Sequence, residues 1–303
     1  MVLKFSICSQ CPARSMPIGD ERKINDPMFD AQIKAFRGKL DGNGYVIKNM
    51  TVNISTGSAG LFSYISGCEI RNLGMIGSVN SGRWDAGGIV GINVVLYGNE
   101  STIVNCFNQG IVFSLGDEDW GYAGGIIGDA PAVEITQCYN TGNIEMLSGR
   151  AGGIVGGASA NGIPIVKTSF NVGAISADSA GGIMGHTYGG FEFMNFYNAG
   201  AITGYSAGGI AGQQAGPGNG LIRASYNSGS LNGNYTGGLN GFCILPLRFD
   251  SCYYLNTVSK AIGSYETGYP VTSITYTPPT AGQLSATQMA TQSSFSGFDF
   301  DNV

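Results

Sequence analysis

Short apolar segments alternate with glycine along most of the chain, and one glycine-rich phrase recurs at a nearly constant interval. The phrase is Ala-Gly-Gly, then two apolar residues, then Gly, as at residues 151–156. The Gly before the apolar residues occurs at Gly60, Gly88, Gly125, Gly153, Gly182, Gly209 and Gly238. The first and last of these copies match the phrase only loosely. The steps are 28, 37, 28, 29, 27 and 29 residues. A period of this size indicates a solenoid, a propeller or an array.

Each repeat divides into three short pieces, which predict three strands per turn. The first is the Gly-Gly phrase, whose paired glycines allow close backbone approach around a short buried strand. The second places an aliphatic residue three positions before Cys, Ser or Phe, followed by an aromatic residue and Asn, as at residues 135–140. The third is Asn-x-Gly-x-aliphatic, as at residues 140–144. The shared Asn is expected to form a ladder from coil to coil inside a turn. Its members are Asn108, Asn140, Asn171, Asn198 and Asn227.

Two other repeat architectures are excluded by the same pattern. No 3.6-residue period runs through the repeats, so a helical array does not fit. A propeller blade needs four strands in about 40 residues, more than one repeat here supplies. The remaining fold class is an all-β, right-handed parallel β-helix (β-solenoid) of about seven coils stacked about 4.8 Å apart. Equivalent side chains then form files along the rod. One predicted aromatic file contains Phe107, Tyr139, Phe170, Tyr197, Tyr226 and Tyr253.

The repeats predict a β-solenoid domain at residues 36–256. Residues 1–35 carry no repeat and are an unassigned N-terminal segment. Their first apolar stretch is too short for a secretory leader, so either the protein stays inside the cell or its native N-terminus is truncated here. Residues 257–303 are predicted to form a C-terminal cap over the last coil. In it, Ser285-Ala-Thr-Gln288 is a capping-box pattern for a short helix, and three Phe residues follow.

Composition narrows the class of partner. Of 303 residues, 43% are hydrophobic and only 12% are charged, and the net charge is −5. A chain with this charge balance is poorly suited to neutralising phosphates, which argues against nucleic acid as a partner. No apolar run approaches the roughly 20 residues of a transmembrane segment.

The seven cysteines form no framework of disulfide pairs. Cys8-x-x-Cys11 has the spacing of half a zinc site, but no second pair and no nearby His completes it, so no metal site is predicted there. Cys106 and Cys138 fall in one file beside small or apolar residues. We interpret them as buried free thiols, with a disulfide between them as the alternative.

In order along the chain, these pieces resemble the GLUG-motif repeats of bacterial surface and adhesin-like proteins and of the repeat region of immunoglobulin A peptidases. The resemblance is carried by Gly-Gly-Ile-Val-Gly, by Asn-Cys-Phe-Asn-x-Gly-x-Val, by the opening at residues 36–47 and by the closing segment at residues 285–303. It covers about residues 36–303. It implies a secreted or cell-surface rod or binding surface. Members of that family normally carry a signal peptide and a longer first segment, from which residues 1–35 depart.

Few residues offer catalytic chemistry. The Gly-Gly phrases lack the Lys-Ser/Thr of a phosphate-binding loop. His186 is the single histidine, so the two-His helix of a zinc peptidase is absent from the sequence, and we interpret His186 as a turn residue. No catalytic residue and no cofactor is predicted.

The repeat period breaks once, in the 37-residue step. The insertion there carries three adjacent acids and two aromatic residues, and Trp84 stands at nearly the same place one coil earlier. Adjacent acids on a loop ordinarily form a solvated tip. The alternative is a ligand-binding patch, because exposed rings beside carboxylates suit a sugar. Its residues are Trp84, Asp117, Glu118, Asp119, Trp120 and Tyr122, of which the three acids are also candidate Ca²⁺ ligands.

The sequence therefore favours a non-enzymatic bacterial cell-surface or secreted protein that acts as an adhesin or binding scaffold for a glycan or a host protein. One alternative is a carbohydrate-active β-helix enzyme, a polysaccharide lyase or glycoside hydrolase that uses the acidic insertion. Another is a structural spacer of a larger surface protein. A groove with the acids opposite Lys or Arg would favour the enzyme, and a flat aromatic patch would favour binding. The oligomeric state is left open.

Overall fold

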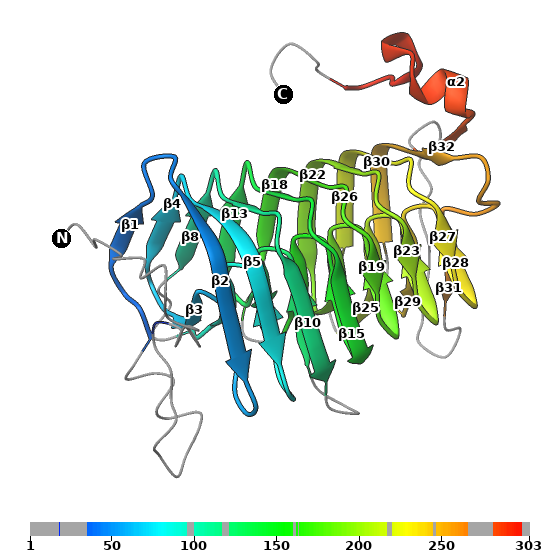
Figure 1. Ribbon diagram of the computed structural model, residues 1–303. Coiled ribbons are helices and arrows are strands. Elements are labelled where there is room, and N and C mark those ends of the chain that lie inside the picture. The colour runs from blue at the N-terminus through cyan, green and yellow to red at the C-terminus, as the bar shows by residue number, and fades with distance from the viewer. Residues whose placement is uncertain are drawn as a thin grey trace.

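The computed structural model describes residues 18, 35–95, 100–116, 121–159, 162, 164–216, 220–244, 247–265 and 281–298. They form a rod of stacked coils in which each strand pairs in parallel with its equivalent in the next coil (Figure 1). The predicted parallel β-solenoid of about seven turns with a short C-terminal helix is confirmed. Its right-handed sense stays a prediction. Among the described residues, no helix is long and apolar enough to cross a membrane.

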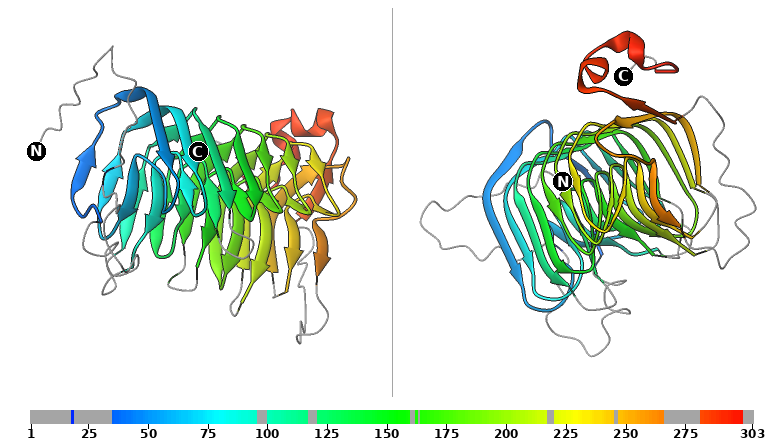
Figure 2. Two further views of the ribbon diagram at one scale, coloured as in Figure 1. Left: turned by 60° about the horizontal axis from the view of Figure 1, so that its bottom comes forward. Right: turned by 90° about the vertical axis from the view of Figure 1, so that its right-hand side faces the viewer.

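Three sheets, which we call A, B and C, run along the rod (Figure 2). Each full coil passes through sheet B, then C, then A. Sheet A contains β3 (Phe62–Ile65), β7 (Val90–Asn93), β12 (Ile127–Asp129), β17 (Val155–Ala158), β21 (Met184–Tyr188), β25 (Ala211–Ala215), β29 (Asn240–Cys243) and β31 (Ile262–Tyr265). Sheet C contains β6 (Ala86–Gly87), β11 (Tyr122–Gly124), β16 (Arg150–Gly152), β20 (Ser179–Gly181), β24 (Ser206–Gly208) and β28 (Tyr235–Gly237).

Sheet B carries the remaining strands, because both the second and the third piece of each repeat join it. Its earlier strands are β1 (Lys39–Asp41), β2 (Val46–Ile54), β4 (Glu69–Arg71), β5 (Gly74–Ser81), β8 (Ser101–Val104), β9 (Phe107–Asn108), β10 (Ile111–Gly116), β13 (Val133–Thr136), β14 (Tyr139–Asn140) and β15 (Ile144–Ser148). Its later strands are β18 (Ile165–Asn171), β19 (Ile175–Ser176), β22 (Phe191–Asn198), β23 (Ile202–Thr203), β26 (Gly220–Asn227), β27 (Leu231–Asn232), β30 (Leu247–Leu255) and β32 (Ala281–Leu284).

A bulge in sheet B explains why Cys or Ser recurs in the second piece. The residue just before that position has positive φ, for example Gln137 at 56°, which interrupts the regular ladder. The next backbone N–H therefore takes a side-chain acceptor from the following coil. The N–H of Cys106 donates to Sγ of Cys138 at 3.4 Å, and the N–H of Cys138 donates to Oγ of Ser169 at 3.1 Å. Both cysteines are buried and unbridged, which confirms free thiols over the disulfide.

The predicted asparagine ladder is confirmed. Nδ2 of each Asn donates to Oδ1 of the next at 2.8 Å, through all five members from Asn108 to Asn227. The same amide also closes its own turn, as where Nδ2 of Asn140 donates to the carbonyl of Gly142 at 2.7 Å. The second Gly of the repeat phrase makes room for the ladder, since a Cβ on Gly153 would lie 2.5 Å from side-chain carbons of Asn171.

The aromatic file is confirmed from Phe107 to Tyr226, on the outer side of sheet B. Successive rings stack with centroids 4.9, 5.0, 4.7 and 5.4 Å apart. Tyr253 follows in register, but Phe295 and Phe298 of the C-terminal segment pack against both Tyr226 and Tyr253. These contacts place the C-terminal segment beside the last coils.

The helix in this segment, α2 (Ala286–Met289), begins with the predicted capping box. A 3₁₀ turn, η1 (Gln292–Ser294), follows it. Figure 2 shows the helix outside the outline of the coil, on the sheet B side. The helix segment packs against the outer rings of sheet B, and the cap over the last coil at residues 257–303 stays a prediction. Strand pairing continues past Asn256 through β31 and β32, and the division of the chain at residue 256 stays a prediction.

Candidate functional site

The Gly-Gly-apolar phrase turns the chain from sheet C into sheet A. In one coil, β16 ends at Gly152 and β17 begins at Val155, so the phrase spans two strands and the corner between them instead of one strand. A Cβ on Gly152 would lie 2.0 Å from the carbonyl oxygen of Val155, so only glycine permits this tight turn. Sheets C and A consequently approach each other closely outside the main apolar core.

Two files of side chains line the angle between these sheets, and we call the space between them the cleft. The sheet C file stands just before the first residue of each phrase, which is Ala or, in the last copy, Thr236. It contains Ser58, Asp85, Tyr122, Arg150, Ser179, Ser206 and Tyr235. The sheet A file contains Tyr64, Ile92, Asp129, Gly157, His186, Gln213, Phe242 and Ser264. The sizes of these side chains decide where the cleft is filled and where it is open.

Tyr122 fills the cleft in the earlier coils. Its side chain is only 5% exposed, and its ring stacks on His186 with centroids 5.9 Å apart and planes at 13°. The ring fits because the facing residue is Gly157, where a Cβ would lie 2.1 Å from a ring carbon. The guanidinium carbon of Arg150 lies 5.9 Å from the ring centroid, a cation–π contact.

Two buried carboxyl groups lie beside Tyr122. Oδ1 of Asp85 accepts from the N–H of Tyr122 at 3.0 Å, and Oδ2 accepts from Oγ of Ser58 at 3.3 Å. Oδ1 of Asp129 accepts from the N–H of Ser159 at 3.1 Å. Burial raises the pKa of Asp85 well above its usual range, with the Asp129 charge adding to it, and burial raises the pKa of Asp129 to about 6.

His186 lies in strand β21 and is buried, so its interpretation as a turn residue is wrong. Burial, with a smaller effect from the Arg150 charge, lowers the pKa of its imidazole to about 3. The ring is therefore neutral at neutral pH and serves as a packing partner for Tyr122. Within the described residues, no group of three or more His, Cys, Asp or Glu side chains is placed to hold a metal ion.

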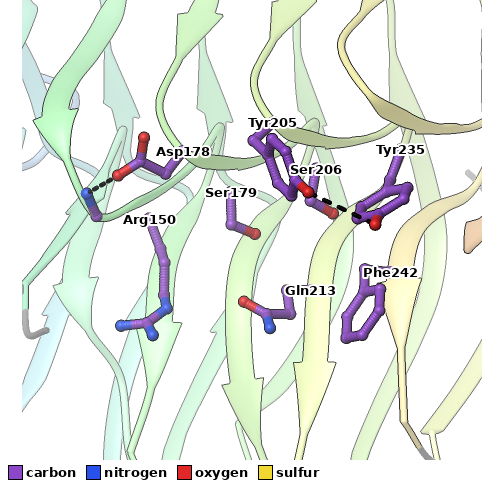
Figure 3. Close-up of a pocket in the computed structure, with 9 residues that line it drawn as sticks. Arg150, Asp178, Ser179, Tyr205, Ser206, Gln213, Tyr235 and Phe242 are labelled. Atoms are coloured by element: carbon purple, nitrogen blue, oxygen red, sulfur yellow. Dashed lines mark hydrogen bonds between the residues drawn. The ribbon is translucent and has the colours of Figure 1, made fainter. Parts of the chain in front are cut away.

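The cleft opens in the later coils because its sheet C file carries two serines in succession. The result is a cavity of about 310 Å³ between Arg150 at one end and Tyr235 with Phe242 at the other (Figure 3). Oγ of Ser179 donates to the carbonyl of Gly185 at 3.0 Å, and Oγ of Ser206 donates to that of Gly212 at 2.8 Å. The lining residues are Gly149, Arg150, Asp178, Ser179, Tyr205, Ser206, Gln213, Tyr235 and Phe242.

Three aromatic rings gather at one end of the cavity. Tyr205 meets Tyr235 edge to face, with centroids 5.1 Å apart and planes at 78°, and their hydroxyls are 3.5 Å apart. Tyr235 and Phe242 lie 5.9 Å apart at 31°. Tyr205 is 56% exposed and stands at the rim. Gln213 adds an amide that hydrogen-bonds to no other described residue, and Oδ2 of Asp178 accepts from the N–H of Gly149 at 2.9 Å.

The patch predicted around the insertion is only partly described. Trp84 is 42% exposed, and its backbone is held by the hydroxyls of Ser81 and Ser114. Tyr122 is buried against His186, so it does not belong to an exposed face. The other members of the patch lie outside the described residues, namely Asp117, Glu118, Asp119 and Trp120.

The cavity was not predicted from the sequence, although the sequence contains a signal for it. That signal is the residue just before the repeat phrase, which changes from Arg150 to Ser179 and Ser206 and then, before Thr236 of the last copy, to Tyr235. Two small residues in succession between large ones leave room in a file of side chains. The pattern is informative only once this file is known to face a second sheet.

No protein-family model matches the sequence, and no curated protein matches it either. One similar solved structure is a protein from Bacteroides ovatus described as a "putative immunoglobulin A1 protease". The identity is 22% and the TM-score is 0.49, over 66% of this chain and 69% of that one. An overlap at this level says nothing about activity, and the GLUG-type resemblance of the repeats stays a proposal.

Proposed function

We propose that this chain is a non-enzymatic binding scaffold of the bacterial surface or of secreted material, and that a glycan or a host surface protein occupies the cleft. The supporting observation is the cavity of about 310 Å³ with three aromatic rings at one end and amide, hydroxyl and charged groups along its length. Concave sites with apolar walls and a few fixed polar groups are the usual form of small-ligand sites. A stiff solenoid holds such walls in fixed positions, which limits the ordering cost of binding.

Binding is favoured over glycoside hydrolysis by the charges in the cavity. Glycosidases generally use a pair of carboxyl groups on either side of the scissile bond. Among the described residues that line the cavity, Asp178 is the one carboxylate, and Arg150 brings the opposite charge. The buried pair Asp85 and Asp129 is engaged with Tyr122, Ser58 and Ser159 and is not part of the cavity lining.

A filled-cleft variant tests this proposal. Ser206→Tyr introduces the side chain that the next coil carries at the same register, Tyr235, and should occupy the cavity. Labelled wild-type protein is expected to be retained on a glycan array or on immobilised mucin, and Ser206→Tyr should abolish that retention. Ser176→Trp, on an exposed position of β19, is the matched control and should bind normally. Release of reducing sugar by the wild type, or equal retention of Ser206→Tyr at unchanged thermal stability, would contradict the proposal.

The insertion supplies a second proposed contact surface. Trp84 is exposed, as a ring that stacks on sugar must be. Its proposed partners are Trp120 and the acids Asp117, Glu118 and Asp119, with Ca²⁺ as a candidate ion. The double variant Trp84→Ala/Trp120→Ala should weaken retention on the array, and added EDTA should do the same if Ca²⁺ takes part. Unchanged retention on every glycan would remove this surface from the proposal.

A further inference from the structure

Building on the proposed function, we infer that the cleft binds one neutral pyranose unit of a glycan, with the apolar face of the sugar on Tyr235 and Phe242 and its hydroxyls on Gln213. The inference depends on the aromatic end of the cavity, on its amide floor and on its size. It also names a ligand class, which the proposed function leaves open between glycan and protein.

The aromatic end offers a wall of the right shape. Tyr235 and Phe242 both line the cavity, with centroids 5.9 Å apart and planes inclined by 31°, so this end of it is apolar. Tyr205 meets Tyr235 at 78° and lies on the solvent side of this wall. A pyranose has one face of C–H bonds that packs on such a wall, while its hydroxyls point sideways. The exposed Tyr205 leaves a way out for the rest of the glycan.

The floor of the cavity offers hydrogen bonds of both kinds. Gln213 has two N–H donors and one carbonyl acceptor, and none of them is used by another described residue. Ser179 and Ser206 also line the cavity, and because their hydroxyl protons go to the carbonyls of Gly185 and Gly212, their oxygens are left as acceptors only. Adjacent sugar hydroxyls can each donate and accept, which matches a neighbouring amide and acceptor oxygen.

Charge and size argue against other ligand classes. A quaternary ammonium ion would suit three aromatic rings. The described residues that line the cavity bring one cation, Arg150, and one carboxylate, Asp178, so they give it no net charge that would select a cation or an anionic sugar. The volume of about 310 Å³ is at the lower end of small-molecule sites, which suits one sugar ring better than several side chains of a protein partner.

Full-length protein titrated with small probes tests this inference. The probes are methyl pyranosides of neutral hexoses, a methyl glucuronide and tetramethylammonium chloride, with binding followed by saturation-transfer NMR. At least one neutral pyranoside should bind. Tyr235→Ala and Gln213→Leu should each weaken it by about tenfold or more, because they remove the stacking wall and the amide. Tyr235→Phe keeps the ring and should change binding by less than about twofold.

The control variant is Tyr45→Ala, which removes a ring that is 73% exposed and does not line the cavity, and it should bind as the wild type does. Preferential binding of the glucuronide or of tetramethylammonium would overturn the inference. So would tight pyranoside binding by Tyr235→Ala at unchanged melting temperature. If no probe binds but mucin retention is lost in Ser206→Tyr, the sugar class is wrong and the scaffold function stands. If no probe binds and Ser206→Tyr is retained on mucin as well as the wild type is, both the pyranose inference and the proposed scaffold function are wrong.

Discussion

Individual buried residues of the cleft make the stability of the folded chain depend on pH. The pKa of Asp129 is about 6 in the folded chain against 3.8 ordinarily, so folding favours its protonated form. The contribution of Asp129 to the free energy of unfolding is fully present below about pH 4 and is lost as pH rises through about 6. The raised pKa of Asp85 acts in the same direction. His186 acts in the opposite direction, because its lowered pKa gives a contribution present above about pH 6.5 and lost on acidification.

A neutral amide at position 129 should therefore stabilise the protein at high pH. Asp129→Asn keeps an oxygen that can accept from the N–H of Ser159 and removes the cost of a buried charge. The free energy of unfolding should rise by up to about 3 kcal/mol at pH 7.5, and the gain should vanish near pH 4. Urea unfolding of both proteins across this range measures the difference, in which the contribution of His186 cancels.

The matched control is a carboxyl group outside the cleft. Glu145 is exposed on β15, and Glu145→Gln should change the unfolding free energy by less than about 0.5 kcal/mol at every pH. A loss of stability in Asp129→Asn that is larger at pH 7.5 than at pH 4 would show that the carboxylate is needed in its charged form. The interpretation of the buried pair would then be wrong.

At the scale of one structural element, the asparagine ladder holds successive coils in register. Asn140 sits in its middle, where Oδ1 accepts from Asn108 and Nδ2 donates to Asn171 and to the carbonyl of Gly142. Asn140→Ala leaves buried polar groups without partners on both neighbouring coils. We expect a loss of about 2–4 kcal/mol in the free energy of unfolding, because each unsatisfied buried group costs about 1–3 kcal/mol.

An exposed asparagine pair supplies the control for the ladder. Nδ2 of Asn80 donates to Oδ1 of Asn53 at 2.7 Å in a similar coil-to-coil bond, but solvent can replace it. Asn53→Ala should therefore cost less than about 1 kcal/mol. Equal losses for the two variants in urea unfolding would show that burial adds nothing to the ladder.

The sequence predicted some of the structural elements correctly and not others. The ladder and the aromatic file follow from the period alone, because equivalent residues of stacked coils must lie side by side. The period alone does not predict that the Gly-Gly phrase forms a corner between two strands. That outcome depends on how closely Gly152 lets the backbone fold toward Val155, which is a matter of geometry that a repeat length does not specify.

For the whole molecule, the repeat length likewise does not show which sheets face each other. The sequence therefore pointed to the insertion as the ligand site and not to the cavity. Tyr122 looks exposed in the sequence because it belongs to the longest repeat, yet Gly157 of the next coil gives its ring a buried place. Ser179 and Ser206 look unremarkable until sheets C and A are known to face each other. The contact of Phe295 with the outer rings of Tyr226 and Tyr253 was also not predictable, because the repeat period does not extend to the C-terminal segment.

Coil deletions separate the scaffold of the whole molecule from its site. Each coil contacts mainly its two neighbours, so removing one complete repeat should leave a folded, shorter rod. Deleting residues 154–182 joins Gly153 to Ile183 and removes Ser179 from the cavity. We expect cooperative unfolding, a urea m-value lower by about one seventh, and loss of pyranoside binding.

The matched deletion removes residues 89–125 and joins Gly88 to Ile126. It takes away the whole insertion and Tyr122 and keeps every residue that lines the cavity. This shorter rod should still bind the pyranoside if the cleft is the site, whereas a site built on the insertion requires the reverse result. Circular dichroism shows for both deletions whether the solenoid has formed. The two binding measurements together therefore assign the ligand either to the break in the repeat period or to the regular coils that follow it.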